Sequence, residues 1–350
     1  MLKYLIPAIT FQSIVIAGGY GTGRELVEFF MTVGPLSGLL AMGVTAVIWM
    51  LVAALSFDMA RRTRSYNYKD FFHNLLGRGW ILFELVYIVI IVLVAAVVAA
   101  SCAELMANLF GLPFVAGTAV FGLWMIGSVG AGAEWLKKAF SFWSTLLYAT
   151  YALVFAFALS QLFASELPFS SETAASEEWL VAGLKYAGYN VASLPAVFFT
   201  LTLLENRREC YIAGILCGLV TITPAVLLFT SLLVLYPEVL SETVPSLALL
   251  AKIDTPWLTF LFQIVLLGTL IETGAGLVHS FNDRLAVTIE LTKKGRFTVA
   301  LVFVVIGVAV SQFGLIDLIA EGYGTITWVV ILLFVLPVLA SPFIKRTDIE

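Results

Sequence analysis

The sequence predicts an all-α polytopic membrane protein with ten transmembrane helices. The first observation is composition: 61% of the 350 residues are hydrophobic and only 12% are charged, which is far outside the range of soluble globular domains. A crossing helix needs about 20 apolar residues, and stretches of that length recur along the chain. We place them, to within several residues, at 4–32, 36–60, 80–108, 113–132, 139–164, 180–204, 210–236, 257–281, 297–312 and 318–341.

The second observation is the distribution of charge, which tests this count independently. Cytoplasmic loops of membrane proteins collect Lys and Arg. With the N-terminus in the cytoplasm, sixteen of the nineteen Lys and Arg residues fall on that side and only Lys252 falls in an outer loop. The pattern predicts a protein of the cytoplasmic (inner) membrane with both termini in the cytoplasm. The net charge of −4 comes from the loops and gives no indication of nucleic-acid binding.

The third observation is a run of glycines inside the first hydrophobic segment. Four of the seven residues 17–23 are glycine, and each costs a helix about 1 kcal/mol relative to alanine. Thr22 is expected to N-cap the helix that follows, with Glu25 completing a capping box. Lipid cannot satisfy free backbone groups, so such a break must be buried in protein or line a cavity. We interpret it as a binding site.

A second interruption opens the sixth predicted span. The stretch 187–195 contains a glycine, an asparagine and Pro195, and Ser193 is positioned to cap the helix that restarts. The two interrupted spans begin two five-span halves, approximately 1–164 and 180–341, of one transmembrane transport domain, 1–350. Because five is odd, the halves cross in opposite directions. This is the inverted repeat of secondary transporters, with the site at the midplane.

The two breaks predict the chemistry of the bound solute. Helix N-termini at the breaks expose N–H groups that suit a carboxylate, whereas carbonyls at the end of the first half-helix suit a cation. We therefore expect a small amino-acid-like or carboxylate-bearing solute, bound by Gly19, Tyr20, Gly21, Thr22, Gly23, Tyr189, Asn190 and Ser193. Tyr87, on the third span, is either a wall of this pocket or a tyrosine of the core.

Polar residues follow one stripe of the eighth span and are candidates for ion coupling. Glu272 lies too deep to reach the interface easily, and an ionisable group at that depth is a functional candidate. Either Thr269 and Thr273 coordinate Na+ with their hydroxyls, or Glu272 carries a proton. A structural hydrogen-bonding role for Glu272 remains open beside these.

Arg24 follows the glycine run by one residue and has three candidate partners. These are the substrate carboxylate, Glu28 one turn along the same helix, and Glu321 at the outer start of the tenth span. A pair with Glu321 would form an outer gate. The basic loop 61–79 carries four aromatic residues and is expected to lie amphipathically along the inner surface.

The repeat, the two breaks and the threonine pair together resemble the LeuT fold of the amino acid, polyamine and cation transporter superfamily. By that resemblance, Na+ would lie between span-1 carbonyls and span-8 hydroxyls, and Arg24 with Glu321 would close an outer gate. The implied Na+ ligands are Ala17, Tyr20, Thr269 and Thr273. Glu272 departs from the sodium-coupled pattern and leaves protons open.

The run Gly18–Leu26 with Phe29 and Phe30 resembles, more narrowly, the opening motif of the YkvI-type bacterial membrane proteins. That motif usually has glutamine at the position of Arg24. The architectural likeness covers the whole chain, whereas this motif covers about a dozen residues.

These observations predict a secondary active transporter that works by alternating access with Na+ or H+ and needs no cofactor. Its partners are the solute, the coupling cation and the bilayer. The alternative from another class is a transporter-fold sensor, like the germinant receptor subunits that the resemblance includes, which binds a metabolite without coupled transport. An enzyme is not expected, because the spans contain no metalloprotease motif, nucleophile elbow or paired aspartates.

Overall fold

The computed structural model describes residues 2–18, 20–129, 133–162, 177–288 and 292–342. Within these ranges every regular element is a helix, as predicted. The longer α-helices are α1 (Leu2–Gly18), α3 (Pro35–Thr63), α5 (Trp80–Phe110), α6 (Phe114–Ser128), α7 (Ala133–Leu162), α8 (Trp179–Val191), α9 (Arg207–Leu232), α11 (Pro256–Thr288) and α12 (Lys293–Ser311).

Shorter elements connect and continue these helices. The short α-helices are α2 (Arg24–Leu26), α4 (Tyr68–Leu76), α10 (Pro245–Ile253), α13 (Leu315–Asp317), α14 (Gly324–Val330) and α15 (Leu336–Ala340). The 3-10 segments are η1 (Tyr20–Thr22), η3 (Gly77–Gly79), η4 (Leu194–Leu203), η5 (Leu233–Leu235) and η6 (Glu238–Ser241). The π-helical segments are η2 (Val27–Met31), η7 (Leu318–Tyr323) and η8 (Ile331–Val335).

Length and composition make this a multi-pass membrane protein. In the described ranges, six helical stretches are long and apolar enough to cross a bilayer: Pro35–Thr63, Tyr68–Phe110, Arg207–Leu235, Pro256–Asn282, Lys293–Ser311 and Leu315–Ala340. Four further apolar helices are shorter: Lys3–Ile16, Phe114–Ser128, Leu146–Leu159 and Leu194–Leu203. The count of ten crossing helices therefore stays a prediction.

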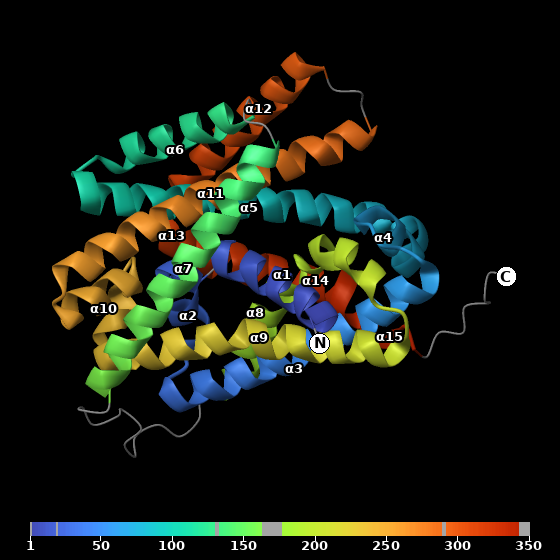
Figure 1. The fold of residues 1–350 in the computed structure, drawn as a ribbon, viewed down its shortest axis with the longest axis horizontal. Coiled ribbons are helices and arrows are strands. Elements are labelled where there is room, and N and C mark those ends of the chain that lie inside the picture. The colour runs from blue at the N-terminus through green and yellow to red at the C-terminus, as the bar shows by residue number, and fades with distance from the viewer. Residues whose placement is uncertain (1, 19, 130–132, 163–176, 289–291, 343–350) are drawn as a thin grey trace.

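Helix α3 packs closely against both α8 and α9. Helices α3 and α9 lie side by side along one edge of the molecule (Figure 1), and small residues allow the contact. A Cβ atom at Gly214 of α9 would overlap the backbone of Ala54 in α3, and one at Gly183 of α8 would overlap the carbonyl oxygen of Ala41. The Thr45 hydroxyl of α3 also donates to the Gly183 carbonyl oxygen at 3.0 Å.

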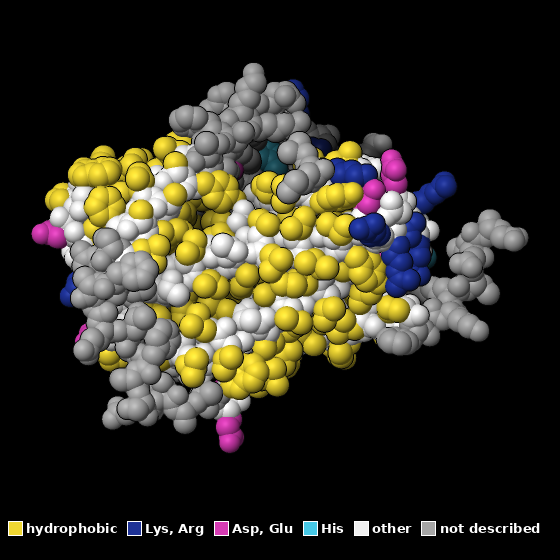
Figure 2. All heavy atoms as spheres, turned by 60° about the horizontal axis from the view of Figure 1, so that its bottom comes forward, with side chains coloured by type: hydrophobic (Ala, Val, Ile, Leu, Met, Phe, Trp, Pro, Cys, Tyr) yellow, Lys and Arg dark blue, Asp and Glu magenta, His cyan; other side chains and the backbone are white. Residues whose placement is uncertain are grey.

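The surface is apolar along the body of the molecule and basic at one end. Figure 2 shows apolar side chains covering the face that carries α3 and α9, with Lys and Arg side chains gathered at one end of it. We call this the α4 end and the opposite one the α10 end, since α4 and α10 mark them in Figure 1. Basic residues of the α4 end include Arg61, Arg62, Arg64, Lys69, Arg78 and Arg207.

The amphipathic segment predicted between the second and third spans is present as α4. Asn67 caps it by accepting a hydrogen bond from the backbone N–H of Asp70 at 2.9 Å. Phe71 and Phe72 are fully buried, and Phe72 stacks on Phe83 of α5 with ring centroids 3.9 Å apart. The apolar side of α4 therefore fixes it against the transmembrane helices.

The α3–α9 contact generates a prediction on stability. Gly214→Ala should lower the free energy of unfolding by about 1–3 kcal/mol, because the added methyl group overlaps α3 backbone that cannot easily move. The matched control is Gly43→Ala in α3, where nothing lies within 4 Å of the added Cβ. It removes a helical glycine and should be neutral or stabilising by up to about 1 kcal/mol. Thermal unfolding in detergent checks both, and equal stability of the two variants would contradict the packing.

Candidate functional site

The glycine run ends α1 and starts a different backbone conformation. Helix α1 ends at Gly18, η1 spans Tyr20–Thr22, and α2 begins at Arg24. The N-cap of α2 is Gly23, at φ 82°, which only glycine adopts without strain. The expectation that Thr22 is the cap is therefore wrong by one residue. The Thr22 hydroxyl instead accepts a hydrogen bond from the backbone N–H of Arg24 at 3.3 Å.

The second predicted break also differs in its capping. Helix α8 ends at Val191, and the chain continues from Leu194 as the 3-10 segment η4. Ser193 stands at the N-cap but makes no side-chain cap. Its hydroxyl donates to the Asn190 carbonyl oxygen at 2.7 Å, while the Asn190 amide donates to the Tyr186 carbonyl oxygen at 3.1 Å. Both polar side chains thus satisfy the end of α8 itself.

Three other elements surround the glycine run. The Tyr151 hydroxyl of α7 donates to the Gly21 carbonyl oxygen at 2.8 Å. A Cβ at Gly21 would lie 2.9 Å from Leu266 of α11, and one at Gly23 would lie 3.1 Å from Pro245 of α10. These contacts satisfy and cover the irregular backbone, as its depth in a membrane would require.

Arg24 is buried, with 3% of its surface exposed, and both terminal nitrogens of its guanidinium group make hydrogen bonds. Nη1 donates to the carbonyl oxygens of Leu240 and Glu242 at 2.9 and 3.0 Å, and Nη2 contacts Glu28 Oε2 at 2.6 Å. Of its three candidate partners, this structure has Glu28. Glu321 is exposed, so the predicted Arg24–Glu321 gate is not formed here.

The prediction that Glu25 completes a capping box is also wrong, because its side chain lies buried, 0% exposed, against α8. The Tyr189 hydroxyl donates to Glu25 Oε1 at 3.4 Å, and Tyr189 stacks on Tyr323 of η7 with ring centroids 4.0 Å apart. An acidic residue at the start of an apolar helix resembles a cap by spacing alone. One feature of the sequence indicates a role other than capping: Arg24, the neighbouring residue, is also charged, and burying a charge inside a span is costly.

The predicted coupling residues of α11 lie on the described part of that helix. The Thr269 hydroxyl donates to the Val265 carbonyl oxygen and that of Thr273 to the Thr269 carbonyl oxygen, both at 2.9 Å. Glu272 is half-buried, and its carboxyl group lies near the Tyr148 hydroxyl of α7. The indole of Trp143 fills the space beside Gly268 and donates to the Val265 carbonyl oxygen at 2.8 Å.

The remaining predicted positions are divided between the described and undescribed parts of the chain. Gly19 lies outside the described residues, as do the side chains of Ala17 and Tyr20, so the proposed Na+ ligand set stays a prediction. Tyr87 contacts Tyr68, Phe83 and Arg284. These contacts place Tyr87 in an aromatic cluster with α4, rather than beside the glycine run.

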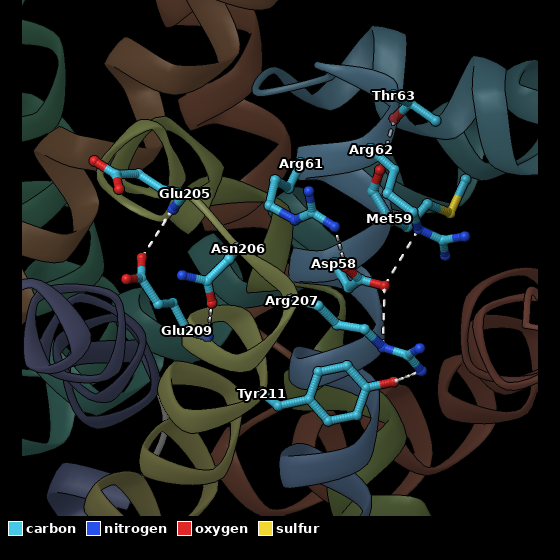
Figure 3. Close-up of polar contacts among 10 residues, drawn as sticks. All are labelled: Asp58, Met59, Arg61, Arg62, Thr63, Glu205, Asn206, Arg207, Glu209 and Tyr211. Atoms are coloured by element: carbon cyan, nitrogen blue, oxygen red, sulfur yellow. Dashed lines mark hydrogen bonds and ion pairs between the residues drawn. The ribbon is translucent and has the colours of Figure 1, made fainter. Parts of the chain in front are cut away.

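Ion pairs link the helices at the α4 end. Arg284 of α11 binds Glu84 of α5 through both carboxylate oxygens, at 3.0 and 3.1 Å. Lys3 of α1 pairs with Glu209 of α9 at 2.7 Å. Asp58 of α3 is approached by three arginines, as Figure 3 shows: Arg61 at 2.8 Å, Arg62 at 3.2 Å and Arg207 at 3.9 Å.

Next to the glycine run, a cavity of about 390 Å³ lies between α1, α7 and α9. Its lining is almost entirely apolar and includes Ile16, Tyr148, Tyr151 and Pro224. Gln12 of α1 bridges the same helices: its amide donates to the Val220 carbonyl oxygen at 2.7 Å, and its oxygen accepts from Tyr148 at 3.3 Å. The break is thus covered by α10 on one side and neighbours a cavity on another.

The chain resembles solved transporter structures over almost its whole length. A Na+-coupled sialic acid symporter in a substrate-bound, outward-open state aligns with a TM-score of 0.54 at 14% identity, covering 97% of this chain and 87% of that one. Inward-facing Mhp1 aligns with a TM-score of 0.57 at 15% identity, covering 97% of this chain and 76% of that one. A manganese transporter mutant from Eremococcus coleocola aligns with a TM-score of 0.58 at 14% identity, covering 96% of this chain and 77% of that one.

At these identities the likeness establishes the fold, which is LeuT-like, as the sequence predicted. No protein-family model matches the chain, and no curated protein matches it as a relative. The narrower resemblance to the YkvI-type proteins therefore stays a prediction.

The Arg24 contacts generate a prediction. Arg24→Lys should lower the free energy of unfolding by about 1.5–3 kcal/mol, because one ammonium group cannot reproduce the planar fork that binds two carbonyls and a carboxylate. Arg207→Lys is the control, since its side chain is 68% exposed and should change stability by less than about 1 kcal/mol. Thermal unfolding in detergent measures both; an unchanged Arg24→Lys melt would contradict the tether.

Proposed function

We propose that this protein is a secondary active transporter of a small amino-acid-like or carboxylate-bearing solute, coupled to Na+ or H+. The LeuT-like fold, found over at least 96% of the chain in three transporter comparisons, carries the proposal. Two of those neighbours are named as a Na+-coupled symporter and a manganese transporter, so the fold supports cation-linked transport without identifying the solute.

The surroundings of the glycine run support alternating access around it. On the α10 side, Arg24 of α2 donates to the carbonyl oxygens of Leu240 and Glu242 at the end of η6, and Pro245 covers Gly23. On another side, the run borders the cavity between α1, α7 and α9. We infer that transport requires these contacts to open in turn. In this proposal the α10 end faces outward and the basic α4 end faces the cytoplasm of an inner membrane.

The proposed solute site is the backbone of 19–23 and 188–193, within one transport domain made of two inverted repeats. In this proposal, backbone N–H groups at these helix ends bind the carboxylate. For the coupling ion we retain both candidates: Na+ at Ala17, Tyr20, Thr269 and Thr273, or a proton on Glu272. The Arg24–Glu321 gate is proposed for another state of the cycle, since Arg24 is bound to Glu28 here.

The alternative function is a metabolite sensor with a transporter fold. A sensor of this kind binds the solute but does not accumulate it and needs no ion coupling. The same binding experiment separates the two functions, because only the transporter links solute affinity to an ion and moves the solute into vesicles.

The test is a thermal-unfolding screen of the purified protein against metabolites rich in amino acids and carboxylates, in Na+ and choline buffers at two pH values. A solute at a hundred times its dissociation constant should stabilise the protein by about 2.7 kcal/mol. Uptake of that solute into proteoliposomes under an ion gradient should follow. Binding without uptake, under every gradient, would replace the transporter by the sensor.

Gly21→Leu tests the location of the site. The larger side chain would meet Leu266 and Tyr151 and fill the break, so the solute should no longer shift the melt, and uptake should fall to the level of empty vesicles. Gly43→Ala, on the open surface of α3, is the control that keeps both. Normal uptake by folded Gly21→Leu would place the solute elsewhere.

A further inference from the structure

Two carboxyl groups one turn apart have opposite surroundings. Glu28 Oε2 lies 2.6 Å from Arg24 Nη2, and its side chain is 22% exposed. Glu25 is 0% exposed. No ion pair joins Glu25 to a cation of the described residues, because Arg24 points away to Glu28 and to the carbonyl oxygens at the end of η6.

Tyrosines face the Glu25 carboxyl group from two elements. Tyr189 of α8 donates to Oε1 at the long distance of 3.4 Å, and Tyr186 of the same helix lies near the carboxyl group. Tyr323 of η7 stacks on Tyr189 at an interplanar angle of 17°. Glu25 Oε2 and the Tyr323 hydroxyl are buried and make no hydrogen bond among the described residues. The titratable groups around Glu25 are thus neutral phenols, beside the mutually paired Arg24 and Glu28.

An ionised carboxylate is poorly supported in such a place. Burying one without a cation costs several kcal/mol, and a single long hydrogen bond compensates little of it. Protonation removes the charge and makes Oε2 a hydrogen-bond donor. Neighbouring phenol oxygens can accept the hydrogen bond that it then donates. The burial and the missing partner therefore favour the neutral acid.

The helix that carries Tyr189 also packs closely against α14 and η8. A Cβ added at Gly188, one residue from Tyr189, would lie 2.8 Å from Ile331 and 3.0 Å from Thr327. The cavities of about 390 and 320 Å³ are lined by other residues, the second around Asn108 and Gln263. A proton needs no such volume, whereas an ammonium group does.

We propose that Glu25 is a proton-binding site, occupied in the closed arrangement described here and emptied when α2 separates from α8 and η7. This rests on the proposed alternating access and assigns the coupled proton to Glu25 rather than to Glu272. On opening, the carboxylic acid O–H bond breaks, the electron pair stays on the carboxylate, and the proton passes to water on the open side. Rebinding reverses these steps.

The test is infrared difference spectroscopy of the purified protein without solute, titrated from acid to alkaline pH in light and heavy water. At neutral pH the wild type should show the carbonyl stretch of a buried carboxylic acid, and Glu25→Gln should lose it. Glu28→Gln is the matched control, since Glu28 is paired with Arg24, and it should retain the band. Glu272→Gln should retain it too.

Two outcomes would overturn the assignment. One is a neutral-pH difference between wild type and Glu25→Gln that contains only carboxylate bands. The other is loss of the acid band in Glu272→Gln. If Glu25→Gln does not fold, Tyr189→Phe replaces it: removing the hydroxyl that donates to Oε1 should move the acid carbonyl band to higher frequency. An unchanged band in this variant would equally contradict the proposal.

The spectroscopic result stands apart from the transport function. If the acid band is assigned to Glu25 but no solute is taken up, the proton site holds and the transporter fails. If uptake occurs and the acid band is absent, the transporter function holds and the proton site at Glu25 fails. When both hold, uptake by wild type should rise in an inward proton gradient, while uptake by Glu25→Gln should not respond to that gradient.

Discussion

The structure depends on one constraint: the backbone of a glycine-rich run must be satisfied by protein where lipid offers no hydrogen bonds. The Gly21 carbonyl oxygen receives the Tyr151 hydroxyl of α7. Gly23 takes a left-handed conformation against Pro245 of α10. Arg24 donates to the carbonyl oxygens of Leu240 and Glu242 at the end of η6. Helices α7, α10 and α11 thus all contact the run where α1 ends, α11 through Leu266 beside Gly21.

The two charged residues after the run are accommodated in different ways. Arg24 is buried, and its two terminal nitrogens bind Glu28 and two backbone carbonyl oxygens, which hold α2 to the segment that precedes α10. Glu25, the next residue, points instead toward α8, where the Tyr189 hydroxyl donates to its carboxyl group and Tyr323 stacks on Tyr189. A charge that is bonded holds a contact closed, whereas one that is not bonded responds to the solvent when the contact opens. Adjacent residues can therefore serve closure and proton exchange separately.

The sequence predicts the architecture well because composition and charge act over long stretches. Long apolar helices, the amphipathic α4 and the LeuT-like fold all agree with it. Side-chain roles at the break are less accessible, because they depend on tertiary contacts. The spacing of Thr22 and Glu25 fits a capping box, yet Gly23 caps α2 and Tyr189 binds Glu25. Tyr87 has the depth in its span that a pocket residue would have, but it contacts Arg284 and Tyr68 of α4, which are distant from it in sequence. Local sequence patterns do not predict such contacts between residues that are far apart in the chain.

Alternating access is the central claim, and cysteine reactivity tests it most directly. Ser246, 1% exposed, lies beside Gly23 on the α10 side, and half-buried Gln12 lies beside Tyr148 and Val220. In a background without the three buried cysteines, Ser246→Cys and Gln12→Cys are labelled with a membrane-impermeant reagent across pH and Na+ conditions. We predict inverse changes: whatever exposes residue 246 protects residue 12. Labelling of both sites that rises and falls together, or never changes, would contradict the account.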